Sequence, residues 1–423
     1  MTHAPARPRS CCRPEFCDRS ALPLLQAAAS ERYLQLTADK VVSSRQPVHI
    51  VHVISNLGYG GAETALARLI QYSNPLGFRH TVVSLTRRGD LADAIEAAGG
   101  TVVALSPALR DALRAVLRGD PPCSGGLAPD VIQGWMMHGN LAAWALRIFR
   151  YRRAALAWNL RMTLVGIAHE RSRTLWMTRM LSHLSRRVDL LIANSESSLR
   201  DHLRVGYRPR ATAVIPNGFD PSVFGTDLHD RHQTRTAWRL SDRAVAFGLV
   251  GRYHRTKGHE VFIRAAAQVL QRQPEARFVL AGTGTDTDEE LKALLDEHNV
   301  AAAFILLGVR RDIPSVMRSL DVVCVPSEYE SFPNVLGEAM ASARPCIATN
   351  VSDVATIMGG AGMLIEVGDV DGLTSAMLAM LDMGTEGREA LGKSARERIV
   401  DNYSLERVVT RYEAHYATLA DRA

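Results

Sequence analysis

The chain has 423 residues, of which 47% are hydrophobic and 22% are charged, and its formal net charge is +6. This composition is that of an ordinary globular protein, and the length exceeds what one hydrophobic core usually supports, so we expect two domains. No apolar run approaches the roughly 20 residues of a membrane-spanning helix, so we expect that the chain does not cross a bilayer. The six cysteines contain no Cys-x-x-Cys pair, which argues against a zinc site and a disulfide framework.

Residues 1–46 differ in character from the rest of the chain. They are rich in arginine and only faintly resemble a signal peptide, because the apolar part is short and is broken by Pro23 and Gln26. Three of the cysteines lie here without a companion set of metal ligands. We therefore expect a disordered extension and a cytoplasmic protein.

From residue 47 onward, short β-branched runs alternate with helical segments, a pattern typical of parallel sheets covered by helices. Residues 47–215 and residues 216–402 are each expected to form a Rossmann-like α/β domain. Strands of the first domain are expected at residues 48–54, 80–85, 101–105, 131–133, 154–158, 189–193 and 212–215. Strands of the second domain are expected at residues 245–250, 277–281, 304–307, 321–325 and 346–348.

A cluster of helix and strand breakers at residues 216–221 predicts the linker between the two domains. After the second domain, residues 403–423 carry apolar side chains at helical spacing, which predicts a last helix from Ser404 to about Leu419.

Three glycines, Gly58, Gly60 and Gly61, lie between the first strand and the helix expected after it. Without side chains, this backbone can approach a diphosphate or a sugar closely. The spacing lacks the Gly-x-Gly-x-x-Gly fingerprint of dinucleotide binding.

The positive charge is concentrated in one segment of the first domain. Between residues 147 and 187 there are ten arginines and one acid, Glu170, so the segment carries +9 and the rest of the chain −3. Residues 173–188 predict an amphipathic helix, with Met177 and Leu181 on the apolar face and Trp176 and Arg179 on the other. The second face fits a solvated surface or a surface that rests on anionic lipid head groups.

In the second domain, Arg252 follows a strand and Lys257 opens the next helix. Two cations beside a helix start suit two phosphate groups, although two surface cations near a loop are the alternative. Further along, Asp286-Thr-Asp288 has the form of a metal-binding pair of acids. Its polar surroundings favour a helix start, so we expect no metal site.

The most informative segment contains Glu330 and Glu338, which are separated by seven residues. The first carboxylate is expected on a loop after the strand at residues 321–325, and the second about one helical turn into the next helix. A loop carboxylate and the amides of a helix start can bind hydroxyls and phosphate together, at the strand ends where open α/β sheets bind ligands. An ordinary exposed helix entrance is the alternative.

Taken in order and spacing, these motifs resemble the retaining glycosyltransferases of family 4, which share the two-domain GT-B fold. The resemblance covers about residues 48–419. It is carried by the first strand with Gly-Tyr-Gly-Gly-Ala-Glu63, by Ile-Ala-Asn-Ser195, Val-Ile-Pro-Asn-Gly-Phe-Asp220, Val-Gly-Arg252 with Lys257-Gly258, Val-Leu-Ala-Gly-Thr-Gly284, and the segment from Glu330 to Glu338.

The resemblance implies a fold of two Rossmann-like domains that face each other across a cleft, and it assigns roles to particular residues. Glu330 would contact the hydroxyls of the transferred sugar and Glu338 the ribose hydroxyls. Arg252 and Lys257 would complete the catalytic set, because fixed cations stabilise the charge on the leaving diphosphate in place of a metal ion. The remaining donor-binding residues would be Gly60, Gly61, Gly282, Gly284, Val309, Asn334 and Val335.

One position departs from the family pattern. Many members have a histidine where this chain has Met162, and a thioether cannot do acid–base work. His138 and His169 are candidate substitutes on the acceptor side, although each also fits a solvated or structural histidine. Arg161 is a candidate for binding an acceptor group.

The resemblance implies a metal-independent, retaining hexosyltransferase that needs no cofactor. It would move a sugar from a nucleotide-sugar donor to a glycan or lipid-linked acceptor in the synthesis of a surface polysaccharide, such as the lipopolysaccharide of a cell envelope. We expect a cytoplasmic protein that is peripheral on the inner face of the cytoplasmic membrane.

Two alternatives remain at this point. One is a sugar-nucleotide epimerase of similar fold, against which the set of Arg252, Lys257 and the two glutamates argues. The other is a binding protein without catalysis, which only Met162 supports. A nucleic-acid partner is not expected, because the positive net charge is not accompanied by a nucleic-acid recognition motif.

Overall fold

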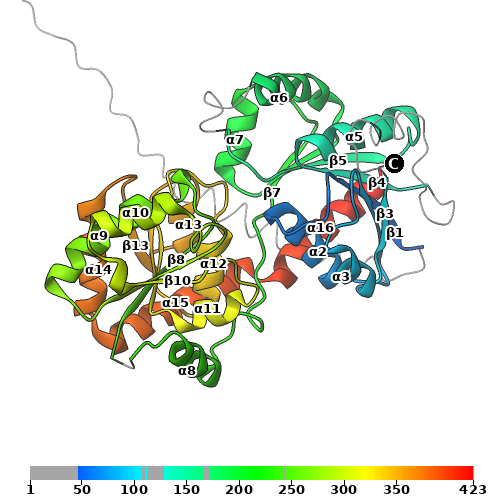
Figure 1. The fold of residues 1–423 in the computed structure, drawn as a ribbon. Helices are drawn as coiled ribbons and strands as arrows, with labels where there is room; N and C mark the ends of the chain where they lie inside the picture. The colour runs from blue at the N-terminus through cyan, green and yellow to red at the C-terminus, as the bar shows by residue number, and fades with distance from the viewer. Residues whose placement is uncertain (1–45, 106–110, 112–127, 165–171, 242, 423) are drawn as a thin grey trace, which may run out of the picture. The chain divides into compact units, whose positions relative to one another are not determined.

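The computed structural model describes residues 46–105, 111, 128–164, 172–241 and 243–422. The expected extension, apart from Gln46, and the candidate His169 lie outside the described residues. The described chain contains two parallel α/β sheets, as the alternation of strand and helix patterns predicted (Figure 1).

The N-terminal sheet has seven parallel strands in the order β3-β2-β1-β4-β5-β6-β7. Alternate residues of β1 pack on opposite faces, because successive side chains of a strand point to opposite sides. Ile50 packs with α2 and α16, whereas Val51 packs with α5 and α6. The strands are β1 (Val48–Ile54), β2 (Phe78–Ser84), β3 (Thr101–Ala104), β4 (Val131–Trp135), β5 (Ala155–Leu160), β6 (Leu190–Ala193) and β7 (Thr212–Val214). The helices are α2 (Gly61–Tyr72), α3 (Ala92–Ala97), α5 (Met136–Phe149), α6 (Ser172–Leu184), α7 (Glu196–Arg204) and α16 (Leu405–Ala420).

The C-terminal sheet has six parallel strands in the order β10-β9-β8-β11-β12-β13. The strands are β8 (Ala246–Val250), β9 (Arg277–Ala281), β10 (Phe304–Leu306), β11 (Val322–Val325), β12 (Cys346–Thr349) and β13 (Gly362–Ile365). The helices are α8 (Leu228–Ala237), α9 (His259–Arg272), α10 (Glu289–Glu297), α11 (Ile313–Ser319), α12 (Asn334–Ala341), α13 (Val354–Met358), α14 (Val370–Asp382) and α15 (Gly384–Tyr403). Short 3₁₀ turns are η3 (Ser185–Arg187), η4 (Arg255–Lys257) and η5 (Ala301–Ala303).

The predicted strands are confirmed to within two residues at their ends, but the prediction missed β13. This edge strand begins with a glycine and contains one β-branched residue, so it lacks the composition that marks a strand. Its position is determined instead by pairing with β12, where Ile347 lies opposite Met363.

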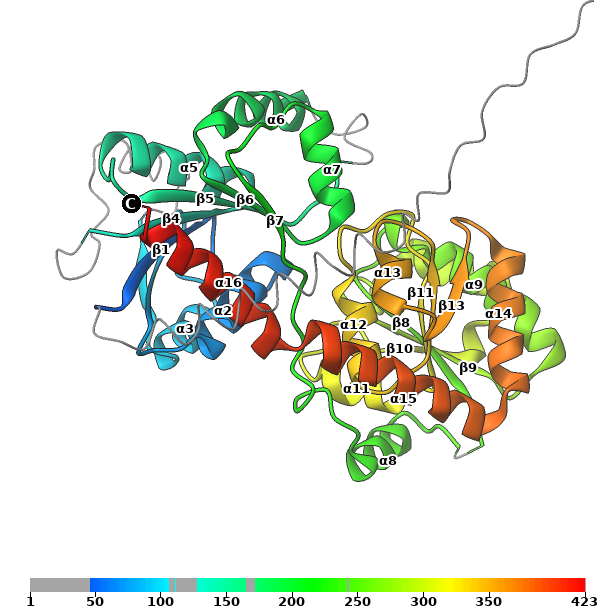
Figure 2. The same cartoon turned by 180° about the vertical axis from the view of Figure 1, so that it is seen from behind.

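The chain crosses between the two sheets twice, and the two crossings are hydrogen-bonded to each other. The amide of Phe219 donates to the carbonyl of Tyr403 at 2.9 Å, and the carbonyl of Phe219 accepts from the amide of Leu405 at 2.9 Å. The break between α15 and α16 falls at Ser404, whose extended backbone ends one helix and begins the next. From there α16 packs against α2, β1 and β4 (Figure 2).

Beneath α16 lies a series of buried and partly buried hydrogen bonds that runs through two stacked histidines. Trp135 Nε1 donates to His52 Nδ1 at 3.2 Å, and His52 Nε2 lies 3.0 Å from His80 Nδ1. His80 Nε2 lies 2.9 Å from Ser73 Oγ, which donates to Glu413 on α16 at 2.8 Å. Because the indole can only donate, each imidazole must be neutral and carry its proton on Nε2.

Because this series of hydrogen bonds requires neutral histidines, we expect the folded protein to become less stable in acid. Burial and, to a smaller extent, the nearby His49 lower the pKa of His80 to about 4. The unfolded chain takes up a proton near pH 6.5 but the folded protein does not, so we expect the free energy of unfolding to fall between pH 6.5 and about 4. His80 alone would account for about 3 kcal/mol of this loss. Denaturant titrations at several pH values measure it.

The variant His80→Gln should flatten this pH dependence, because an amide does not titrate. The matched control is His229→Gln on α8, where the imidazole is exposed. Equal pH slopes for wild type and His80→Gln would contradict the assignment.

Three further observations concern the thiols, the amphipathic helix and the helix lengths of the described residues. Cys324 and Cys346 are buried free thiols, and burial raises the pKa of both. In α6 the two predicted faces separate: Leu181 is buried, whereas Trp176 and Arg179 are exposed. Among the helices described, none combines the length and the apolar character that a membrane span requires.

Candidate active site

The strand order of the C-terminal sheet marks where a ligand would bind. The order reverses between β8 and β11, and open α/β sheets bind ligands at the carboxyl ends of the strands beside such a point. Lys257 follows β8 and Glu330 follows β11. The topology therefore brings together two predicted residues that are 73 positions apart in the sequence.

Lys257 and Glu330 form an ion pair with a defined geometry. Lys257 Nζ donates to Glu330 Oε1 at 2.5 Å, and Ser327 Oγ donates to the same oxygen at 2.9 Å. The Lys257 side chain is 31% exposed and that of Glu330 is 13% exposed. Glu330 Oε2 has no hydrogen-bond partner among the described residues, so it is available to accept bonds from ligand hydroxyls.

The loops that carry this pair are fastened to each other. The amide of Glu328 donates to the carbonyl of Thr256 at 2.9 Å. Gly258 adopts a left-handed conformation with φ of 72°, and a Cβ at this position would lie 2.0 Å from the carbonyl oxygen of Pro326. Only glycine fits there, which explains why Lys257 is followed by glycine at the start of α9.

The pair borders a cavity of about 180 Å³ beneath the start of α12. Its wall includes the predicted donor-binding residues Asn334 and Val335, together with the ring of Phe332. The first turn of α12 contributes backbone N–H groups and the positive end of the helix dipole, both of which favour an anion. The cavity thus offers a cation, a carboxylate oxygen and a helix start to one ligand.

Other predicted donor-side residues lie outside the wall of this cavity. Arg252 follows β8 and is exposed. Gly282 has a φ of 141°, and a Cβ there would meet the carbonyl of Gly251 at 2.2 Å, so glycine is needed where the loops after β8 and β9 cross. Gly284 also lies in a left-handed turn, and Val309 is 67% exposed in the loop after β10.

Glu338 has a partner that the sequence did not indicate. Its carboxylate lies 3.9 Å from the guanidinium of Arg68 on α2, and both side chains are largely buried. Burial raises the pKa of Glu338, and Arg68 partly offsets the rise. Arg68 carries no motif signal, because its role depends on a contact between helices that are far apart in the sequence.

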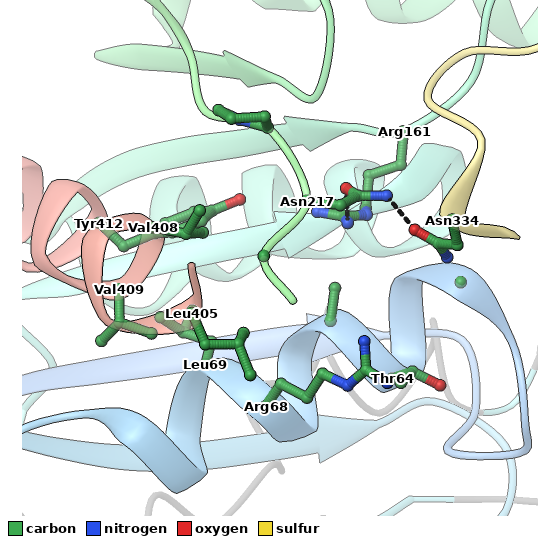
Figure 3. A pocket seen from close by; sticks show the side chains of 14 residues that line it. Thr64, Arg68, Leu69, Arg161, Asn217, Asn334, Leu405, Val408, Val409 and Tyr412 are labelled. Carbon is green, nitrogen blue, oxygen red and sulfur yellow. Dashed lines mark hydrogen bonds between the residues drawn. The ribbon is translucent and has the colours of Figure 1, made fainter. Parts of the chain in front are cut away.

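Asn334 also lines a second, smaller cavity where the linker, α2 and α16 meet (Figure 3). Here the guanidinium of Arg161 donates to Asn217 Oδ1, and Asn217 Nδ2 donates to Asn334 Oδ1 at 2.5 Å. Arg161 also stacks over the indole of Trp135, 5.6 Å from the ring centroid, and lies beside Tyr412. The structure therefore places Arg161 against the linker. It also brings Asn217 of the linker motif into this group, a residue for which the sequence predicted no role at the site.

The N-terminal sheet has its own reversal of strand order, between β1 and β4. Gly60 is the N-cap of α2 and Gly61 is its first residue, after the loop that follows β1. His138 is exposed in the first turn of α5, directly after β4, and Met136 before it has an unusual φ of 61°. Met162 follows β5, and its carbonyl accepts a hydrogen bond from Ser198.

The described residues contain no group of three or more His, Cys, Asp or Glu side chains that could hold a metal ion. Asp288 is the N-cap of α10, and its carboxylate accepts from the amides of Glu290 and Leu291. The expected helix start at Asp286-Thr-Asp288 is therefore confirmed.

Two parallel sheets flanked by helices, each with a candidate binding edge at a reversal of strand order, form the GT-B fold. The family model Glycosyltransferase Family 4 matches residues 59–223, and the model Glycosyl transferases group 1 matches residues 244–383. Together these segments span more than half of the chain. The chain belongs to this family of glycosyltransferases.

Individual relatives match less of the chain. A UDP-Gal:α-D-GlcNAc-diphosphoundecaprenol α-1,3-galactosyltransferase of Escherichia coli is 26% identical over 49% of this chain and 54% of its own length. A D-inositol 3-phosphate glycosyltransferase of Kribbella flavida is 33% identical over 49% of this chain and 52% of its own length. The chain thus spans about half the length of the curated relatives it matches.

Solved structures show the likeness in fold. HepE of Anabaena, crystallised with UDP and glucose, has a TM-score of 0.74 and 21% sequence identity, and the match covers 86% of this chain and 97% of HepE. At this identity the likeness establishes the fold alone.

Proposed function

We propose that the chain is a metal-independent, retaining hexosyltransferase that moves a sugar from a nucleotide-sugar donor to a glycan or lipid-linked acceptor. The observation that carries this proposal is that the Lys257–Glu330 pair and the first residues of α12 line the same cavity. A nucleotide sugar presents a diphosphate and a ring of hydroxyls side by side. The cavity presents a cation and helix amides beside a free carboxylate oxygen.

In the proposed reaction, the bond between the anomeric carbon and the diphosphate oxygen breaks, and a bond between that carbon and the acceptor oxygen forms. The acceptor attacks from the face that the diphosphate leaves, and its proton passes to the leaving phosphate. Negative charge grows on the diphosphate as the bond breaks, so Lys257 and the α12 amides stabilise the transition state more than the bound substrate. This route needs no histidine at the position of Met162 and no cofactor.

The test is release of nucleoside diphosphate from a panel of sugar nucleotides, with a chelator present and with a panel of glycan and lipid-diphosphate acceptors. We expect release from one donor that resists the chelator, and a product whose anomeric configuration, read by NMR, matches that of the donor. An inverted product would contradict retention, and loss of release with chelator would contradict metal independence. Conversion of the donor to an epimer without release would favour the epimerase instead.

We further propose that the acceptor is carried on a membrane surface, as in the synthesis of surface polysaccharide, and that the protein acts peripherally on the cytoplasmic face. One relative is described as acting on a diphosphoundecaprenol-linked sugar, which supports a lipid-linked acceptor. In this chain, the exposed side of α6 and η3 combines a tryptophan that is 62% exposed with several cations. We call it the α6 face; it consists of Trp176, Arg179, His183, Arg186 and Arg187.

The α6 face predicts binding to anionic vesicles. Each cation near such a surface contributes about 1 kcal/mol, so replacing Arg179, Arg186 and Arg187 together by Gln should weaken binding about 100-fold at low salt. Flotation with phosphatidylglycerol vesicles measures it, and phosphatidylcholine vesicles control for charge. Trp176→Ser should also weaken binding, whereas Leu228→Ser, a change of a comparably exposed apolar residue on α8, should not. Wild-type protein that stays unbound to the anionic vesicles would contradict the proposal.

A further inference from the structure

We propose that Arg161 and Asn217 are positioning residues, which orient the side-chain amide of Asn334 so that its Nδ2 donates a hydrogen bond to the donor diphosphate. This inference rests on the proposed function, because it assigns a further contact within the same site. It concerns the small cavity of Figure 3, where the three side chains lie in sequence from the N-terminal sheet to α12.

The direction of the hydrogen bonds follows from the chemistry of the first residue. A guanidinium can only donate, so Asn217 must turn its oxygen toward Arg161. Its Nδ2 therefore faces Asn334, which must present its own oxygen in return. The opposite orientation of either amide would set N–H against N–H. One half-buried cation thus determines the orientation of two amides in succession.

The remaining group of Asn334 is then a donor, Nδ2, on the side of the start of α2. A Cβ built on Gly61 would lie 3.5 Å from Asn334 Nδ2, so this nitrogen lies beside the glycine loop that begins α2. Within the described part of the chain, Asn334 Nδ2 has no hydrogen-bond acceptor. Asn334 is also the first residue of α12 and lines the Lys257–Glu330 cavity. Its side chain and the helix amides therefore form one set of donors for a phosphate group.

The orienting residues are held firmly by their surroundings. Arg161 stacks on Trp135, which is fully buried, and Asn217 is 6% exposed in the linker. Asn334 itself is half-buried, so its free nitrogen remains accessible to a ligand.

The substitution Asn217→Asp inverts this arrangement while keeping the shape of the side chain. A carboxylate only accepts, so it still pairs with Arg161 but draws Nδ2 of Asn334 toward itself. Asn334 then presents an oxygen to the phosphate. Because a hydrogen bond to a charged group is lost, we expect nucleoside diphosphate to bind roughly 10- to 100-fold more weakly.

A double-mutant cycle separates this effect from the added charge. Calorimetric titration of the full chain with UDP, ADP, GDP and dTDP identifies the diphosphate that the wild type binds. Asn334→Ala should weaken its binding by a similar factor to Asn217→Asp, and the double variant should be about as weak as either single variant. Thermal melting of each variant checks the fold.

Three results would overturn the inference: wild-type affinity in Asn217→Asp, wild-type affinity in Asn334→Ala, or losses that multiply in the double variant. Multiplying losses would show that the introduced carboxylate acts through its charge alone. If the wild type binds none of the four diphosphates, the proposed function fails and this assignment fails with it.

Discussion

Replacing Lys257 by Met should lower the rate constant of diphosphate release about 100- to 1,000-fold, while the melting temperature changes little. Methionine keeps the length of the side chain but removes the charge that lies 2.5 Å from Glu330 Oε1. The loss should appear in kcat more than in KM, because the cation stabilises charge that grows as the bond breaks. Steady-state assays with the donor identified from the panel measure both constants.

The matched control for this variant is Lys292→Met on α10. Lys292 Nζ lies 2.8 Å from Glu289 Oε1, so it also pairs with a glutamate in the same domain, but on an exposed helix surface. Its removal should leave kcat and KM unchanged. If the two lysine variants had equal activity, Lys257 would not be the cation that stabilises the leaving group.

The second large effect is expected for Glu330→Gln, which should lower kcat/KM about 100-fold. Lys257 and Ser327 both donate to Oε1, so the glutamine must keep its oxygen at that place. Its Nε2 then replaces the free Oε2, and an acceptor for the sugar hydroxyls becomes a donor. The expected result is weaker recognition of the sugar with little change in affinity for free nucleoside diphosphate.

The control here is Glu289→Gln, which removes a carboxylate from the exposed pair on α10. If Glu330→Gln lost affinity for free nucleoside diphosphate by the same factor as it lost kcat/KM, Glu330 would contact the phosphates or support the fold of the cavity. That outcome would contradict its assignment to the sugar.

Much of the fold was predictable because local composition and final structure agree. The strands β1 and β9 are marked by their own β-branched and apolar residues, and the prediction placed both of them without error. The edge strand β13 was not predictable in this way, because pairing with β12 stabilises a segment that has little strand character of its own.

In the candidate site, too, some residues are recognisable from local sequence, whereas others are recognisable only from their contacts in the fold. Lys257 and Glu330 stand in motifs with glycines and helix starts, so their chemistry is visible in the sequence. Arg68 stands in no such motif, and the motif that contains Asn217 gave that residue no role at the site. Each acquires its role from a partner on α12. The buried His52–His80 pair is likewise visible only once two neighbouring strands bring the rings together.

The most direct test of the proposed donor site is a crystal structure of the chain with the nucleoside diphosphate that it binds most tightly. We predict that the diphosphate lies within hydrogen-bond distance of Lys257 Nζ and of the first amides of α12, with Glu330 Oε2 open toward the position of the sugar. A diphosphate that lies away from the carboxyl ends of β8 and β11, without contact to Lys257 or α12, would contradict the site and the mechanism built on it.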